Sequence, residues 1–454
     1  MKKTALCLAL LGLLALGGQA LAVICAIDEV PAATLLLPYF EVNVGPGADG
    51  STQNTLFSIN NASATAVLAH VTVWSDLSVP VLDFNVYLTG YDVQTINLSD
   101  ILVNGMLPQT ASAGQDPTDT ISPKGTFSQD INFASCSGLL PPPPLPADFV
   151  QYLKDSLTGK PSSFILGQCA GRNLGDNIAR GYVTVDTVNN CTLRFPSDPG
   201  YFQPGGSGDA TDQNVLWGDY FYLNSQASFA DGNPLVHIEA SATNPETTTP
   251  NFYTFYGRYT KPVAWSAADN REPLATNWAA RFLNGGPFTG GTDFIVWRDS
   301  KFTVPAPFTC PSTNGRPAWF PLSQEGLVIF DEQEHPQVPQ TFPVSPPPPT
   351  GSLVPFPAEA QSTHIGGADL PVPYNFGWIY MNLNTMVTGT GVVNNPLDPA
   401  AAQAFVTVRM TSQGRYSVGF DAIHLDSACS AGAYTLTLTG ANHSTPPGSI
   451  APAP

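Results

Sequence analysis

The sequence predicts an all-β protein, built from tandem antiparallel β-sandwich domains with Pro/Gly-rich loops and one short helix. Three observations lead to this fold class. Many short segments alternate apolar and polar residues with a period of two, which is the pattern of half-buried strands. The 454 residues include 40 Gly and 44 Pro, which terminate strands and form turns. Hydrophobic residues make up 43% of the chain and charged residues only 11%, so a large core is available and disorder is disfavoured.

Residues 1–22 predict a secretory signal peptide. Lys2 and Lys3 form a basic start, an apolar stretch follows over residues 5–16, and Ala-Leu-Ala at 20–22 provides a small-residue cleavage site. The apolar stretch is shorter than the roughly 20 residues of a membrane anchor. We therefore expect an exported protein, periplasmic or extracellular, that begins at Val23 and has no transmembrane segment after signal removal.

The charge balance restricts the partners. Seventeen Lys and Arg stand against 35 Asp and Glu, giving a net charge of −18 and a pI near 4.4. So few basic residues cannot neutralise a row of phosphates, so we expect no binding of nucleic acid. The charge balance is compatible with a protein or glycan partner at the cell envelope.

Cysteine usage agrees with export. After signal removal six cysteines remain, an even number that predicts three disulfides among 15 pairings. They are Cys25, Cys136, Cys169, Cys191, Cys310 and Cys429. Cys136 and Cys169 flank a Pro-rich excursion, and we expect a bond between them to stabilise it.

Individual elements follow from the alternation. Residues 404–411 and 415–422 alternate on either side of a turn at 412–414 and predict a hairpin. A helix is expected at 148–157, where apolar residues recur at helical spacing behind Asp148. Further strands are expected at 65–76, 182–188, 235–240, 253–259, 275–283, 293–297 and 434–439.

An internal echo suggests two domains. Residues 54–76 and 277–299 have equal length, an Asn near the middle and a Val-Trp-x-Asp ending. The alternative is that two hairpins of similar pattern arose from common β chemistry. The expected division is a first sandwich at 23–196 with a Pro-rich helical excursion at 136–170, a linker at 197–214, a second sandwich at 215–440 with a Pro-rich loop at 343–357, and a disordered tail at 441–454.

Residues 82–102 (LDFNVYLTGYDVQTINLSDIL) resemble the closing strands of secreted immunoglobulin-like sandwich domains. More widely, segments such as PAATLLLPYFEV, TDFIVWRD and RYSVGFDAIHLDSAC resemble an uncharacterised group of bacterial exported proteins over most of the mature chain. This resemblance implies an immunoglobulin-like sandwich and carries no activity with it.

Common catalytic signatures are missing from the sequence, including Gly-x-Ser-x-Gly, phosphate loops and His-Glu-x-x-His. His237 and Glu239 alternate on one strand face and suit an acid/base pair, although a solvated face explains them better. An acidic cluster with His335 suits either a cation or a solvated loop; its members are Glu325, Asp331, Glu332 and Glu334. We expect His70 to be a hydrogen-bonded core residue.

Trp74 and Trp297 end the two echoing segments, and we expect both to fill the core between sheets.

The best candidate for a ligand site lies at residues 196–234, where aromatic rings and acids concentrate. Rings stack on sugars while carboxylates accept hydroxyl protons, and the same acids suit Ca²⁺. The candidate residues are Tyr201, Phe202, Asp209, Asp212, Trp217 and Asp219. The alternative is that Trp217 is buried and opens the first strand of the second domain.

These patterns favour a non-catalytic exported structural or interaction protein. The alternatives are a glycan-binding module and a glycoside-active enzyme, which needs two carboxylates about 5 to 9.5 Å apart. No catalytic residue and no cofactor is assigned, apart from the Ca²⁺ alternative.

Overall fold

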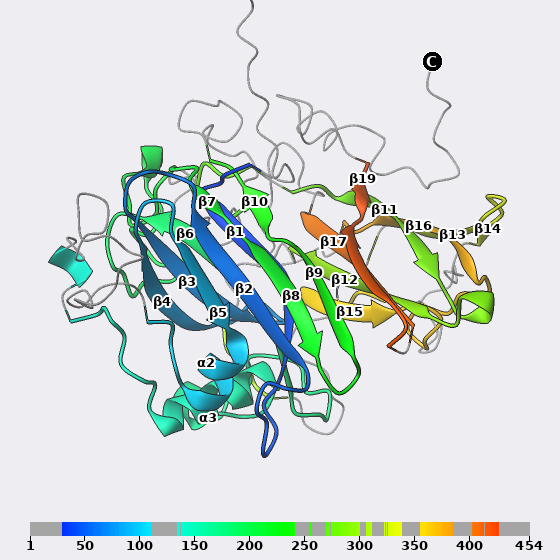
Figure 1. Ribbon diagram of the computed structural model, residues 1–454, viewed down its shortest axis with the longest axis horizontal. Coiled ribbons are helices and arrows are strands. Elements are labelled where there is room, and N and C mark those ends of the chain that lie inside the picture. Colours follow the sequence, from blue (N-terminus) through cyan, green and yellow to red (C-terminus); the bar gives the residue numbers. More distant parts are fainter. Residues whose placement is uncertain are drawn as a thin grey trace, which may run out of the picture.

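The computed structural model describes residues 30–109, 134–136, 138–240, 255–256, 269–272, 274–299, 306–310, 322, 324, 326–337, 355–384, 402–412 and 414–425. Within them the chain is mostly strand, and the strands form four antiparallel sheets. Figure 1 shows these sheets along the long axis of the molecule, with the earlier strands at one end and the later strands at the other. The predicted all-β class with antiparallel sandwiches is thus confirmed.

The first half of the chain contributes two sheets. The inner sheet has the order β10 (Val236–Ile238), β1 (Thr34–Asn43), β6 (Ile178–Val188), β3 (Val67–Ser75) and β4 (Pro80–Leu88). The outer sheet has the order β5 (Val93–Asn97), β2 (Asn54–Asn61), β8 (Asp219–Asn224) and β9 (Phe229–Pro234), and β7 (Leu216–Trp217) also pairs with β2.

The second half contributes the other two sheets. One has the order β14 (Pro336–Gln337), β13 (Gly326–Asp331), β16 (Phe376–Asn382), β11 (Asn277–Leu283) and β19 (Ile423–His424). The other has the order β15 (Ala360–His364), β12 (Gly291–Arg298), β17 (Ala404–Thr411) and β18 (Ser417–Asp421). The predicted hairpin is present as β17 and β18.

Residues 216–238 pair with strands of the first half. β8 pairs with β2 over Asn54 to Phe57, and β10 pairs with β1 over Thr34 to Leu36. From the sequence, the second domain is expected to start at residue 215, because residues 197–214 are rich in Gly and Asp and have the composition of a linker. The strand pairing instead groups residues 216–238 with the first half.

The echo in the sequence corresponds to equivalent strand pairs. β2 and β11 each lie in one sheet, and the strands that follow them, β3 and β12, each lie in another. β3 is flanked by β4 and β6, and β12 by β15 and β17. β2 is flanked by β5 and β8, and β11 by β16 and β19. Six strands of each half therefore pair in the same order along the chain.

Two α-helices lie at one end of the first half (Figure 1). α3 (Ala147–Leu157) is the predicted helix, and it buries Val150, Leu153 and Leu157. α2 (Leu98–Asn104) was not expected, because the resemblance of residues 82–102 to sandwich domains implies strands there. Asn97 caps α2 by accepting a hydrogen bond from the Ser99 amide, and Gly105 ends it in the left-handed conformation. Short 3₁₀ turns lie at Ala134–Cys136, Ser163–Ile165, Pro204–Gly206 and Gly286–Phe288.

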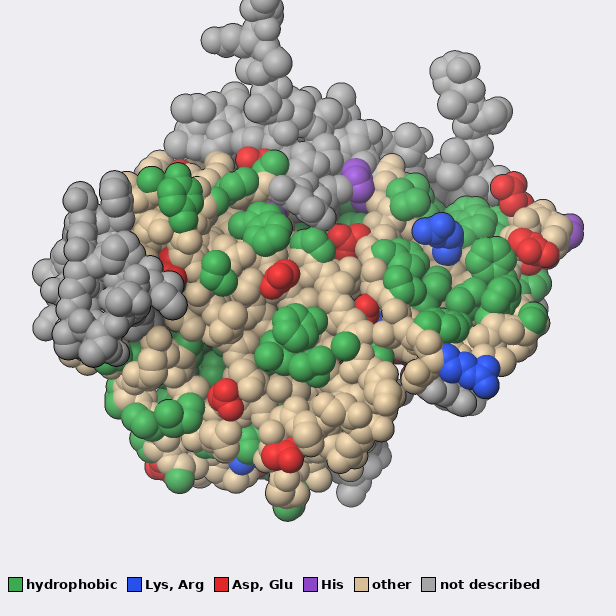
Figure 2. Space-filling view, in the orientation of Figure 1, with side chains coloured by type: hydrophobic (Ala, Val, Ile, Leu, Met, Phe, Trp, Pro, Cys, Tyr) green, Lys and Arg blue, Asp and Glu red, His purple; other side chains and the backbone are tan. Residues whose placement is uncertain are grey.

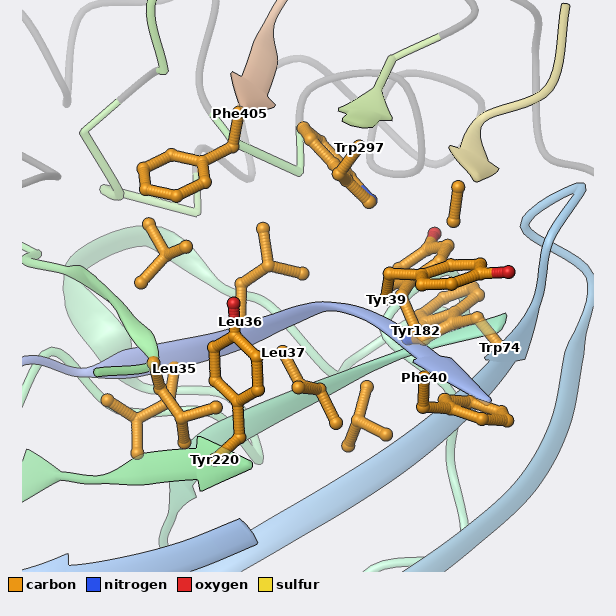
Figure 3. Close-up of a cluster of buried hydrophobic side chains, with 14 of the residues drawn as sticks. Leu35, Leu36, Leu37, Tyr39, Phe40, Trp74, Tyr182, Tyr220, Trp297 and Phe405 are labelled. Carbon is orange, nitrogen blue, oxygen red and sulfur yellow. The ribbon is translucent and has the colours of Figure 1, made fainter. Parts of the chain in front are cut away.

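The hydrophobic core is continuous between the halves. Trp74 and Trp297 are both buried, as expected, and both contact Tyr182, with ring centroids 5.7 Å and 6.0 Å away. Figure 3 shows Trp297 and Phe405, from the second half, next to side chains of β1. The halves are therefore packed against each other through large apolar side chains.

The disulfide pattern differs from the expected one. Cys136 is bonded to Cys191, and Cys169 is bonded to Cys310, so the predicted bond between Cys136 and Cys169 is wrong. Proximity to the Pro-rich excursion was a poor guide, because each cysteine is bonded to a segment distant in sequence. Cys25 and Cys429 lie outside the described residues. The same is true of residues 343–354 of the expected Pro-rich loop and of the expected strand at 434–439.

Candidate functional site

Four of the candidate site residues belong to a buried polar network. Tyr201 is fully buried and its hydroxyl donates to Asp186 at 2.8 Å, while Phe202 packs edge-on against the Tyr201 ring. Asp209 accepts from Thr192 and Arg194, and Asp212 from Asn270 and Arg271. The structure thus places Tyr201 and Phe202 among protein neighbours, with little ring surface open to a ligand.

Arg271 and Asp186 are the centre of this network. Arg271 is 1% exposed and donates to Thr34, to the Thr211 carbonyl and to the Asp269 carbonyl. Asp186 also accepts from the Tyr256 hydroxyl at 2.9 Å and from Thr34. Because each buried charge has several hydrogen-bond partners within the protein, we interpret the network as a structural element that connects these segments.

Trp217 and Asp219 lie elsewhere, where β7 meets β8. The Trp217 ring is partly buried and contacts His237, and Asp219 is exposed and accepts from Ser58 at 2.7 Å. The structure therefore does not bring the six candidate residues into one pocket.

The remaining sequence candidates show no ligand set. His237 is buried and its Nε2 accepts from the Gly218 amide at 3.4 Å. His335 contacts Asp331 on an exposed turn, and Glu325 is not described. His70 is buried beside Asn85, as expected. Within the described ranges no three His, Cys, Asp or Glu side chains are placed to hold a metal.

A cavity of about 210 Å³ opens where the two halves meet. Its walls are the turn between β8 and β9, the turn between β17 and β18, and the facing strands β1, β12 and β17. The lining side chains are Glu41, Gln53, Asn54, Tyr222, Leu223, Asn224, Ala227, Ser228, Phe229, Asp293, Arg409, Thr411 and Tyr416, with Gly414 in the second turn. The cavity combines charged, amide, hydroxyl and aromatic groups from both halves.

A cross-strand row of three side chains lies at one side of the cavity, and two of them, Asp293 and Arg409, line it. Asp293 on β12 is directly opposite His364 on β15 and Arg409 on β17. Arg409 donates to Asp293 Oδ2 through Nε at 3.1 Å and Nη2 at 3.0 Å, and His364 Nδ1 lies 2.8 Å from Asp293 Oδ1. Opposite charges on adjacent strands stabilise such a row.

Arg409 extends from this row toward the first half. Its guanidinium carbon lies 5.4 Å from the centre of the Tyr222 ring and 5.5 Å from that of Phe229. Its Nη1 lies 3.9 Å from Glu41 Oε2. One arginine therefore contacts two rings and one carboxylate of the first half. We call this region of contact between the two halves, which includes the cavity, the joint.

Glu41 on β1 has mainly neutral partners. It accepts from the Tyr39 hydroxyl at 2.9 Å and from the Gln53 amide at 2.9 Å. Arg180 Nε lies 3.7 Å away, but Arg180 is bound more closely by Asp176, at 2.7 Å. The Glu41 carboxylate is thus positioned by hydrogen bonds and shares both of its nearby cations.

The electrostatics keep Asp293 ionised. Burial alone would raise its pKa, but the hydrogen bond with His364 and the charge of Arg409 outweigh this effect and lower it. The same hydrogen bond raises the pKa of His364. Burial raises the pKa of the Tyr222 hydroxyl, which donates to the Tyr39 carbonyl. Asp293 is therefore a fixed anion near neutral pH.

Only part of this site could be expected from the sequence. Tyr222 lies in the aromatic stretch at 196–234, whereas Glu41, Asp293, Arg409 and Tyr416 were not assigned to a site. The sequence does contain one indication of this site. Although the chain has only 17 Lys and Arg, one of them, Arg409, lies within the apolar, alternating strand at 404–411. Charge at such a position commonly marks a joint or a site.

No protein-family model matches the chain, and neither a curated protein nor a solved structure matches it. Among the helices that the structure describes, none is both long and apolar enough to cross a membrane.

Proposed function

We propose that the protein is an exported, non-catalytic interaction protein that binds a small hydroxylated ligand, of the carbohydrate class, in the cavity between its two halves. The observation that carries the proposal is the convergence of Glu41, Asp293, Arg409 and aromatic rings on one cavity from strands of both halves. Ligand sites commonly lie between domains and combine apolar walls with a few fixed polar groups.

The lining chemistry suits a sugar. Carboxylates and amides accept and donate to hydroxyl groups in fixed planes, and rings contact the apolar face of a pyranose. Tyr416 is 39% exposed, so its ring has free surface, and its hydroxyl is held by the Phe288 carbonyl. Cavities that hold drug-sized ligands measure roughly 300–1,000 Å³. A cavity of about 210 Å³ suits a smaller ligand, such as one sugar ring.

The charge state of Asp293 favours binding over cleavage. Glycoside hydrolysis needs one carboxyl group with a raised pKa that donates a proton, and a second carboxylate nearby. Arg409 and His364 lower the pKa of Asp293, so it is a poor proton donor. A hydrolase would need a different acid.

Export is part of the proposal. Disulfides persist mainly in oxidising compartments, and two join distant segments of this chain. The signal-like residues 1–22 support the same location.

A glycan array followed by calorimetry on the intact mature protein tests the proposal. We expect binding of a carbohydrate that is weakened at least about tenfold by Tyr416→Ala, since stacking contacts are lost. Tyr91→Ala is the matched control, because Tyr91 is 72% exposed and does not line the cavity. The absence of carbohydrate binding, or equal weakening by both changes, would overturn the proposal. Release of free sugar from a bound glycan would favour the glycosidase alternative.

A further inference from the structure

We infer that the ligand of the joint cavity carries a positive charge, and that its class is a sugar with a primary amine. This inference rests on the proposed function, since it names the kind of carbohydrate that the cavity would select. It comes from the number and pairing of the charges that surround the cavity.

Four carboxylates surround two guanidinium groups near this joint, because Asp231 also interacts with the charge of Arg409. Arg409 is bound by Asp293 at 3.0 Å and lies 3.9 Å from Glu41, and Arg180 is bound by Asp176 at 2.7 Å and lies 3.7 Å from Glu41. Each arginine is thus closest to another acid. With all four carboxylates ionised the group carries two net negative charges. Of the two carboxylates that line the cavity, Glu41 is the one without a close cation of its own.

Glu41 is also the carboxylate in which an added charge matters most. Its side chain is 10% exposed, and its hydrogen bonds from Tyr39 and Gln53 come from neutral donors. A partly buried carboxylate attracts a cation more strongly than a solvated one, because the surroundings screen the charge less. An ammonium group on a ligand would complete the charge balance of the joint.

The acidic character of the whole chain acts in the same direction. A formal net charge of −18 attracts cationic ligands and repels anionic ones. Acidic side chains are spread over the face of the molecule drawn in Figure 2. Acidic sugars such as uronic acids would meet both this field and the excess carboxylate at the joint. A neutral sugar would leave the charge of Glu41 unbalanced, and an amino sugar would offset it.

His364 modulates the charge. The groups that face it are Asp293 on β12 and Arg409 on β17, and its pKa is raised by the bond to Asp293. Protonation of His364 offsets one of these negative charges, and protonation of the Asp231 carboxylate, whose pKa burial raises to about 6, removes another. The preference for an amine should therefore weaken on acidification below about pH 6.

The test compares ligands that differ only in charge. Calorimetry on the intact mature protein at about pH 7, where both amines are largely protonated, measures glucosamine and 6-amino-6-deoxyglucose against glucose and N-acetylglucosamine. We expect at least one amino sugar to bind about tenfold tighter than glucose, and acetylation to remove the gain. If neutral sugars bind as tightly as amino sugars, the inference is wrong while the proposed function stands. If no sugar binds, the proposed function itself fails.

Two variants locate the effect. Glu41→Gln should abolish the preference for the amine, so that amino and neutral sugars bind about equally tightly. The control, Glu332→Gln, makes an equal charge change on an exposed turn and should leave the preference unchanged. In the second variant, His364→Gln in an Asp231→Asn background, the preference should no longer shrink on acidification to about pH 5.5, because neither group then titrates. His364 is 59% exposed in its side chain, so this variant keeps the test available if Glu41→Gln fails to fold. A preference that survives Glu41→Gln, or a pH dependence that survives the replacement of both His364 and Asp231, would refute the assignment.

Discussion

Replacing Arg409 by Met tests whether the joint between the halves depends on one buried cation. The change keeps an unbranched apolar stem and removes the guanidinium. Asp293, 20% exposed, then loses two hydrogen bonds, and Glu41 loses one of its two nearby cations. The rings of Tyr222 and Phe229 also lose the cation between them.

The size of the effect follows from the partners that remain. Removing one member of a buried ion pair costs about 3–5 kcal/mol. Asp293 keeps His364, and Glu41 keeps Tyr39 and Gln53, so we expect the lower end, about 3 kcal/mol. The pKa of Asp293 is lowered in the folded protein, so this contribution is present above about pH 4 and is lost as Asp293 protonates at lower pH.

Urea unfolding followed by tryptophan fluorescence and circular dichroism measures the loss. The control is Arg415→Met, an equal substitution of an exposed arginine, which should change stability by no more than about 0.5 kcal/mol. Combining Arg409→Met with Asp293→Asn should recover about 1–2 kcal/mol, since the orphaned carboxylate is then neutral. Equal stability of the two Met variants, or strict additivity in the double variant, would refute the reasoning.

Three further predictions concern other parts of the chain. Burial raises the pKa of Asp231 to about 6, so the contribution of its protonated form to stability is lost as pH rises from about 4 through 6. In urea titrations, Asp231→Asn should therefore be more stable than the parent by about 2–3 kcal/mol at pH 7.5. Near pH 4 the two proteins should be equally stable. An advantage independent of pH would contradict this. The two described disulfides leave Cys25 and Cys429 among the six cysteines of the predicted mature chain, so peptide mapping should find these two joined and alkylation should find no free thiol. N-terminal sequencing of the exported protein should begin at Val23, and an intact Met1 would exclude the signal peptide.

Periodicity was a good guide where a strand is half-buried or a helix is amphipathic. The alternation around 404–422 predicted β17 and β18, and the spacing of Val150, Leu153 and Leu157 predicted α3. The echo at 54–76 and 277–299 also corresponds to real strand pairs. These features depend on local sequence, which a reader of the chain can see directly.

Local signals were overlooked at α2. Asn97 and Gly105 mark its two ends, and Leu98, Ile101 and Leu102 recur at helical spacing. The short helix follows β5 directly, and the resemblance of residues 82–102 to sandwich strands extended the expected strand structure past the end of β5. A cap before an apolar residue and a Gly after seven residues would have identified it.

The cavity and the disulfides depend on distances that sequence does not contain. Glu41, Asp293 and Arg409 come from three strands in two halves, and they meet only because β1 packs against β12. Likewise Cys169 and Cys310 are separated by 141 residues. Only the packing of sheets brings such groups together, so composition indicated the β8–β9 side of the cavity, with Tyr222 and Phe229, and not the groups that face it from the other strands.

The position of β1 has a consequence for how the chain matures. This strand is the first described element, yet it lies inside its sheet, between β6 and β10. Thr34 pairs with Ile238, so both edges of β1 are covered only after more than half of the chain is available. A chain that emerges from its N-terminus thus presents the apolar run TLLLPYF unpaired for a long interval. Newly made protein should depend on a holding chaperone that shields this segment until residue 238 has emerged.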